Sequence, residues 1–317
     1  MKPSHKRNKI ALIGGGHIGG TIAHLAALKR LGDIVILERT EGYAKGKALD
    51  LEQMEPIESC DATIKGTADY KDIEGADVVI VSAGVARTQG IASREALLQT
   101  NHEIIKTVAA GVSRYCPHAF VIVITNPLDA MTYAFWKESG LSHKMVVGMA
   151  GVLDTARFRL FLARALHVSV ESVTAFVLGG HGDTMIPLVR YSAVNGIPLP
   201  DIIKMGWISG AEVEQIVHRT VHGGAEIVNL LQNGSAFYAP AAAAIEMTES
   251  YLMNKRKIFP CCTYLSGEYN MRDVYFGVPI IIGESGVEKI IEIELNAEEK
   301  ELLRKSAVSV RKLIESL

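Results

Sequence analysis

The sequence is poor in the features that mark several classes of protein. Its 317 residues include four cysteines, and these show neither the paired spacing of a zinc site nor the density of a disulfide scaffold: Cys60, Cys116, Cys261 and Cys262. We therefore expect no metal site and a reducing, cytoplasmic setting. No apolar run approaches the ~20 residues of a membrane span, and the run Ile10–Ile13 ends at glycines too soon for a secretory signal.

Neither sign of charge dominates. The chain has 33 Lys and Arg against 35 Asp and Glu, a formal net charge of −2. This balance leaves no electrostatic footprint for nucleic acid or for an anionic membrane. The sequence also lacks the patterns G-x-S-x-G, H-E-x-x-H and G-x-x-x-x-G-K-S/T. It therefore gives little support to a serine hydrolase, a zinc metalloprotease or a P-loop nucleotide-binding protein.

What the sequence does contain begins with a glycine-rich turn. Gly14, Gly16 and Gly19 satisfy G-x-G-x-x-G between an apolar run and a stretch with helical periodicity at 21–31. Such glycines let a pyrophosphate approach the positive end of the helix. The next apolar run ends in Glu38, about 20 residues downstream, where an acid can hold a ribose diol. The strand–turn–helix context favours a dinucleotide site over an incidental glycine turn. The acid Glu38 disfavours a 2′-phosphate, so NAD is expected rather than NADP.

The first half alternates apolar runs with helical patterns, the runs being 10–13, 34–37, 77–81 and 120–124. This alternation predicts an α/β fold with a Rossmann-type, doubly wound parallel sheet over residues 1–150. At 317 residues, with roughly 100–200 per domain, a second domain is expected. Residues 151–317 read as a mixed α+β domain, with a strand at Val173–Leu178, a helix at Gly210–Leu231, β-rich segments over 258–283 and a helix capped by Asn296 and Glu299.

The central candidate is His181, which stands among glycines in Gly179-Gly-His-Gly-Asp183 directly after an apolar run. Bare glycines let a ligand approach an imidazole that titrates near neutral pH. A histidine at a simple turn is the plainer alternative. Asp154 and Arg157 are three residues apart and share one helix face. They form either an intrahelical ion pair or, with His181, part of one cleft in which Asp154 orients the base.

Six segments then resemble, in order and along almost the whole chain, the lactate/malate dehydrogenase family, and most of all its lactate-dehydrogenase-like malate dehydrogenases of bacteria: 13–20, 82–84, 124–127, 151–157, 179–183 and 234–240. The resemblance implies reversible oxidation of (S)-malate to oxaloacetate with NAD. It implies that His181 donates and accepts the proton with Asp154 as its partner, that Arg157 clamps the C1 carboxylate, that Asn126 hydrogen-bonds near the reacting oxygen, and that Arg94 polarises the carbonyl.

Arg87 bears on the substrate in the same comparison. Malate-specific members of the family carry Arg at the matching loop position, and lactate-specific members carry Gln. An arginine buried without its anion is costly, which disfavours pyruvate. The loop Val85–Arg94 departs from the usual family pattern, because it lacks proline on either side of Arg87 and has one residue more between Arg87 and Arg94.

The resemblance also implies an NAD site, and an assembly of two or four copies of the chain. The residues expected to line the NAD site are Gly14, Gly15, Gly16, His17, Ile18, Gly19, Glu38, Asn101, Ile124, Thr125 and Asn126. The alternatives are a lactate dehydrogenase, a non-catalytic NAD-binding protein, and an NAD-using glycosidase with a metal site. The scattered cysteines offer the last of these no evident ligand set.

Overall fold

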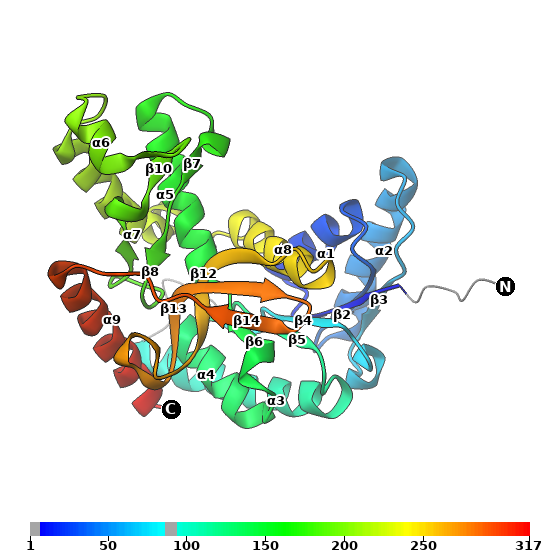
Figure 1. Cartoon of the computed structure of the whole chain (residues 1–317). Coiled ribbons are helices and arrows are strands. Elements are labelled where there is room, and N and C mark those ends of the chain that lie inside the picture. The colour runs from blue at the N-terminus through cyan, green and yellow to red at the C-terminus, as the bar shows by residue number, and fades with distance from the viewer. Residues whose placement is uncertain (1–6, 86–93) are drawn as a thin grey trace.

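The computed structural model describes residues 7–85 and 94–317 (Figure 1). Nine strands in these ranges form one sheet, in the order β14-β13-β12-β6-β5-β4-β1-β2-β3. Six of them run parallel: β1 Lys9–Ile13, β2 Asp33–Leu37, β3 Ile64–Thr67, β4 Val78–Val81, β5 Phe120–Val123 and β6 Val146–Gly148. The other three are antiparallel: β12 Lys257–Ser266, β13 Arg272–Gly283 and β14 Gly286–Ile290.

Helices cover both faces of the sheet, which explains why its central strands are continuous apolar runs. Ile10 and Leu12 of β1 pack in the layer of α1 (His17–Leu28) and α8 (Tyr238–Leu252). Ala11 and Ile13 pack in the layer of α3 (Arg94–Tyr115) and α4 (Leu128–Ser139). Figure 1 shows these pairs of helices on opposite sides of the sheet, with α2 (Glu41–Glu58) near the edge at β3.

Most of the remaining elements build a second lobe, at the upper left of Figure 1. Its core joins α5 (Ala150–Leu166) to α7 (Gly210–Leu231) through buried apolar side chains such as Phe158, Leu162 and Val213. The lobe also contains α6 Leu199–Lys204 and the short strands β7 Val173–Thr174, β8 Val177–Leu178, β9 Ile186–Pro187, β10 Ala193–Val194 and β11 Ile197–Pro198. Single 3₁₀ turns lie at 70–73, 143–145, 170–172, 189–191 and 268–270, and α9 (Ala297–Glu315) ends the fold.

The predicted α/β fold with a Rossmann-type sheet is confirmed, with two refinements. The sheet does not end with the first half of the chain, because β12 pairs with β6 through Cys262 and Gly148 and carries the sheet on into β13 and β14. The expected strand Val173–Leu178 divides into β7, which pairs with β10, and β8, which pairs with β9. At the division the backbone N–H of Val177 donates to the Thr155 hydroxyl on α5, a side chain that takes the place of a strand partner.

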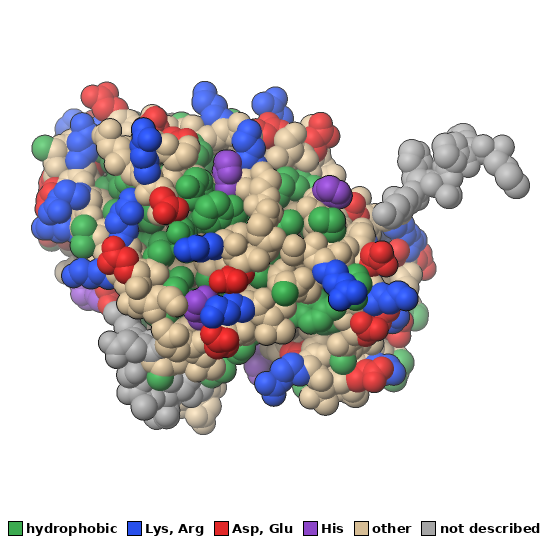
Figure 2. All heavy atoms as spheres, turned by 90° about the horizontal axis from the view of Figure 1, so that it is seen from below, with side chains coloured by type: hydrophobic (Ala, Val, Ile, Leu, Met, Phe, Trp, Pro, Cys, Tyr) green, Lys and Arg blue, Asp and Glu red, His purple; other side chains and the backbone are tan. Residues whose placement is uncertain are grey.

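Charges of both signs are interspersed on the face of the molecule shown in Figure 2. Within residues 7–85 and 94–317, every helix is too short or too polar to cross a membrane.

Candidate functional site

His181 lies in the turn between β8 and β9, next to two residues of α5. Its Nδ1 is 2.8 Å from Oδ2 of Asp154, and Nη1 of Arg157 donates to Oδ1 of the same carboxylate at 3.1 Å. The Asp154 side chain is almost wholly buried, while the side chains of Arg157 and His181 are 12% and 17% exposed. The structure thus brings the three residues together, with a buried carboxylate behind two partly accessible groups.

Electrostatics at this site favour a protonated imidazole. Burial lowers the pKa of His181, but the charge of Asp154 and its hydrogen bond outweigh burial, with a smaller contribution from Asp129, so the pKa is raised. The Arg157 guanidinium opposes the rise. A histidine held in this way can deliver a proton to an oxygen at its other ring nitrogen and take it back.

Asp129 is a part of the site that the sequence analysis missed. It lies in the first turn of α4, it is 4% exposed, and its Oδ2 accepts the backbone N–H of His181 at 2.7 Å. The available signal was the acid itself, since Leu128-Asp-Ala-Met131 opens, after Pro127, a helix that is mostly apolar up to Trp136. A carboxylate buried in such a helix requires a partner.

The glycine-rich turn has the form needed to hold a dinucleotide. A Cβ at Gly19 would lie 1.9 Å from the Gly14 carbonyl oxygen, whereas nothing described lies within 4 Å of one at Gly16. Gly16 is the N-cap of α1, where no side chain caps the helix and no acid lies in the first turn. The first N–H groups of α1 can therefore meet a phosphate. Glu38 accepts the backbone N–H of Gly15 at 2.8 Å, and so lies directly beside the turn.

Two further residues of the turn, His17 and Ile18, form the start of α1. The exposed His17 ring stacks on Phe237, with ring centroids 5.1 Å apart. Ile18 is half-buried and packs against the core. The imidazole of His17 thus links the turn to the segment before α8.

The carboxyl ends of β4 and β5 meet at Asn101, which is fully buried on α3. Its Nδ2 donates to the carbonyl oxygen of Asn126 at 2.7 Å, and its Oδ1 accepts the backbone N–H of Val85 at 2.7 Å. Ile124 and Thr125 are buried in the same strip, where Thr125 Oγ1 donates to the Ala83 carbonyl oxygen at 2.7 Å; Asn126 is exposed and precedes a cis peptide bond to Pro127.

The structure does not describe the side chains of Arg87 and Arg94, the two arginines of the predicted loop. Arg87 lies outside the described residues, and Arg94 is described by its backbone alone, as the first residue of α3. Their predicted contacts with substrate therefore rest on the sequence.

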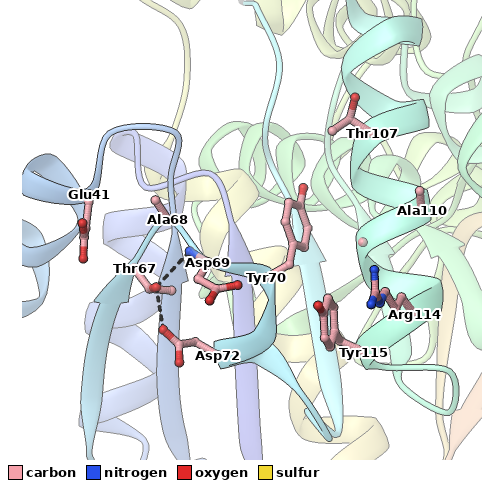
Figure 3. Close-up of a pocket in the computed structure, with 11 residues that line it drawn as sticks. Glu41, Thr67, Ala68, Asp69, Tyr70, Asp72, Thr107, Ala110, Arg114 and Tyr115 are labelled. Atoms are coloured by element: carbon pink, nitrogen blue, oxygen red, sulfur yellow. Dashed lines mark hydrogen bonds between the residues drawn. The ribbon is translucent and has the colours of Figure 1, made fainter.

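A hollow of about 860 Å³ lies away from His181, between the end of β3 and the carboxyl half of α3 (Figure 3). Thr67 stands at its wall, where its hydroxyl donates to Asp72 at 2.6 Å and accepts the backbone N–H of Asp69 at 3.0 Å. Tyr70 and Arg114 face the same space. None of the lining residues belongs to the His181 cluster, so this hollow is separate from the candidate site.

A dinucleotide turn on a doubly wound sheet, followed by a lobe that presents His181, Asp154 and Arg157, defines a class of NAD-dependent oxidoreductase. The family model for the NAD-binding domain of lactate/malate dehydrogenases matches residues 8–148, and the model for their α/β C-terminal domain matches residues 151–317. The chain belongs to the lactate/malate dehydrogenase family, and NAD is its cofactor.

Solved structures similar to this chain include both substrate classes. The malate dehydrogenase of Cryptosporidium parvum is 46% identical, with a TM-score of 0.96 over 98% of this chain and 99% of that one. The lactate dehydrogenase of the same organism, in complex with lactic acid and NAD, is 44% identical, with a TM-score of 0.95 over 98% of both chains. The lactate dehydrogenase of Eimeria maxima with NADH and oxamate is 44% identical, with a TM-score of 0.96 over 99% and 95%.

Proposed function

We propose that this protein is a malate dehydrogenase, which oxidises (S)-malate to oxaloacetate reversibly. The observation that carries the chemistry is the cluster in which Asp154 joins the His181 ring to the Arg157 guanidinium. Bound NAD supplies the hydride acceptor. In the direction of oxidation, His181 takes the hydroxyl proton, and Asp154 stabilises the imidazolium that forms.

Recognition of the substrate rests on guanidinium groups. Arg157 binds the C1 carboxylate, because a planar fork pairs with a carboxylate through two hydrogen bonds. We assign Arg94 to the reacting carbonyl and Asn126 to a hydrogen bond beside it. The hydrogen bonds that join the buried Asn101 to Val85 and to Asn126 support this assignment, because they tie the start of the loop to the Asn126 backbone.

The choice of malate over lactate rests on Arg87, whose charge matches the second carboxylate of a dicarboxylate substrate. A loop that closes over pyruvate would bury this arginine without a partner, at a cost that a dicarboxylate removes. Lactate dehydrogenase is the competing function, and the mixture of activities among the similar structures keeps it as the alternative to test.

Residues 1–150 would bind NAD and residues 151–317 would carry the substrate site. The NAD contacts are assigned to the turn residues Gly14–Gly19, to Glu38 beside them, and to Asn101 and Ile124–Asn126 at the strand ends. Glu38 would bind the ribose diol, since each of its carboxylate oxygens, holding one backbone N–H, can accept a further hydrogen bond.

We further propose a homodimer or homotetramer in the cytoplasm. Exposed apolar side chains on two helices support self-association: Leu49 and Ile57 on α2, and Leu230 and Leu231 on α7. The cysteines, all free and buried, fit a reducing compartment.

The test is NADH oxidation by the purified protein, with oxaloacetate and pyruvate measured side by side. Rapid turnover of oxaloacetate with little turnover of pyruvate is the expected result. The reverse preference would make the protein a lactate dehydrogenase, and no turnover of either substrate would leave a non-catalytic NAD-binding protein.

A further inference from the structure

The turn that carries His181 is held at three successive backbone N–H groups, each by a different part of the fold. Gly179 donates to the carbonyl oxygen of Gly277 on β13 at 2.9 Å, and Gly180 donates to Oγ of Ser306 on α9 at 3.0 Å. His181 donates to Oδ2 of Asp129 on α4 at 2.7 Å. Of these three acceptors, Asp129 is the one that can carry a charge.

The surroundings of Asp129 are those of a group with more than an anchoring role. Its Oδ1 is fully buried and has no hydrogen-bond partner among the described residues. A neutral acceptor would anchor the turn without the cost of burying this second oxygen, as Ser306 does at Gly180. The position in the first turn of α4 favours a negative charge, because the helix dipole is positive there.

When His181 is protonated, the charges around the imidazole balance only if Asp129 is included as a carboxylate. Asp154 and Arg157 face His181 from α5 and Asp129 faces it from α4, while Cys262 of β12 faces Asp129. With His181 protonated, two cations meet two carboxylates; with His181 neutral, one negative charge is left over. Burial raises the pKa of the Cys262 thiol well above its usual range, so this thiol adds no charge.

We propose that Asp129 is a positioning residue that acts through His181: as a carboxylate it fixes the backbone at the histidine, and its negative charge favours the protonated imidazole. The proposal rests on the proposed function, in which His181 must hold a proton to reduce an oxo acid. Burial raises the pKa of Asp129, and this rise outweighs the lowering by the His181 N–H, by the charge of a protonated His181 and by the Cys262 thiol beside it. Protonation of the imidazole and ionisation of Asp129 therefore support one another.

The sign of the pH effect follows from the raised pKa of His181. Reduction requires the protonated ring, so kcat/KM for reduction is full below this pKa and falls as the pH rises through it. Loss of the Asp129 charge lowers the pKa of His181 and moves the fall to lower pH. A shift of about one pH unit, or about tenfold in kcat/KM on the alkaline side, is expected for a charge of this kind near the ring.

The experiment compares Asp129→Asn with Ser306→Ala in the full-length protein. The amide oxygen of Asn can still accept the His181 N–H, so D129N removes the charge and keeps the hydrogen bond. S306A removes a neutral anchor from the neighbouring residue of the same turn. The readouts are the pH profile of kcat/KM for oxaloacetate reduction and the pH dependence of diethylpyrocarbonate modification at His181, measured by peptide mass spectrometry.

A downward shift of both profiles in D129N, with unshifted profiles in S306A, supports the proposal. Unshifted profiles in D129N, or equal shifts in both variants, overturn it. The modification profile needs no turnover, so it decides the role of Asp129 even if the unmodified protein reduces neither oxo acid and the proposed function fails.

If D129N does not fold, infrared spectra of the unmodified protein with ¹³C-carboxyl aspartate decide at neutral pH. The absence of an isotope-sensitive band from a protonated aspartic acid supports an ionised Asp129, and the presence of such a band overturns the proposal.

Discussion

Two carboxylates hold His181 from different directions, Asp154 at the ring and Asp129 at the backbone. Asp154 also accepts a hydrogen bond from Arg157, so one buried side chain orients both the proposed proton carrier and the proposed substrate clamp. A change at Asp154 would therefore disturb both groups at once. Changes at the two partners themselves separate proton transfer from binding.

The proton-transfer role predicts the effect of His181→Asn. Asparagine cannot exchange a proton near neutral pH, so kcat should fall by about 10²–10⁴-fold while NADH binding, followed by nucleotide fluorescence, stays unchanged. His167→Asn is the matched control, because His167 is exposed at the end of α5 in a left-handed conformation that Asn tolerates. Retention of the unmodified kcat in H181N would contradict the role.

The specificity role of Arg87 predicts a change of substrate. In Arg87→Gln the second carboxylate of oxaloacetate loses its cationic partner. Binding of pyruvate then no longer buries an unpaired arginine. The ratio of kcat/KM for oxaloacetate to that for pyruvate should fall at least tenfold. Arg39→Gln, which changes an exposed arginine next to Glu38, is the control for loss of charge. An unchanged ratio in R87Q would mean that another group binds the second carboxylate.

At this scale the sequence predicts residues that stand in recognisable patterns. His181 among glycines and the spacing of Asp154 and Arg157 made a shared cleft one of the alternatives, the family resemblance implied it, and the structure brings the three residues together. Asp129 belongs to no such pattern, because it meets His181 across 52 residues of chain through a backbone N–H. A contact of this kind depends on the packing of α4 against the sheet, which no local pattern encodes.

Among the secondary-structure elements, α9 supports the site from outside the His181 cluster. Its residue Ser306 holds Gly180, and a Cβ on Gly180 would lie 2.4 Å from Val310 of the same helix. The start of α9 is fixed by a capping box, in which Asn296 accepts the N–H of Glu299 at 2.8 Å and Glu299 accepts the N–H of Asn296 at 2.9 Å. The cap thus supports the turn that carries His181.

We therefore expect Asn296→Ala to lower the free energy of unfolding by about 1 kcal/mol, since the N–H of Glu299 loses its side-chain acceptor. Urea denaturation measures the change. Glu298→Ala is the control, because Glu298 is exposed in the same first turn outside the capping box, and its effect should stay within about 0.5 kcal/mol. Equal losses in the two variants would argue against the cap.

Capping signals also explain which boundaries the sequence predicts well. Helix α7 spans the predicted Gly210–Leu231, because Ser209 and Glu212 form a capping box at its start. Helix α5, whose face carries Asp154 and Arg157, begins at Ala150, where no side chain caps it and no capping signal marks the start. The strand predicted at Val173–Leu178 divides because β7 and β8 find different partners, and pairing partners are a tertiary property.

In the whole molecule, the sheet and the second lobe meet at Gly277 and Gly179. The Gly179 N–H donates to the Gly277 carbonyl oxygen, and a Cβ on Gly277 would lie 2.3 Å from the carbonyl oxygen of Gly179. This approach leaves no room for a side chain. The site therefore depends on how closely β13 lies against the turn before His181.

Gly277→Ala should push the turn away from β13, with a loss of about 1–3 kcal/mol in the free energy of unfolding and a lower kcat. Thermal unfolding and turnover are the measurements. Gly46→Ala on α2 is the control, because nothing described lies within 4 Å of its added Cβ and alanine favours a helix. A G277A variant as stable and active as the unmodified protein would show that the close approach is dispensable.

The pairing of β6 with β12 has a consequence for biosynthesis. A ribosome completes β6 at Gly148 and must still add residues 149–256 before β12 begins at Lys257. At about 5–20 residues per second, the nascent chain spends on the order of ten seconds with β6 as an open edge of a sheet. Open edges recruit strands from other chains, so nascent chains on crowded polysomes are exposed to aggregation during this interval. A chaperone that shields β6 in the same interval would raise the yield of folded protein.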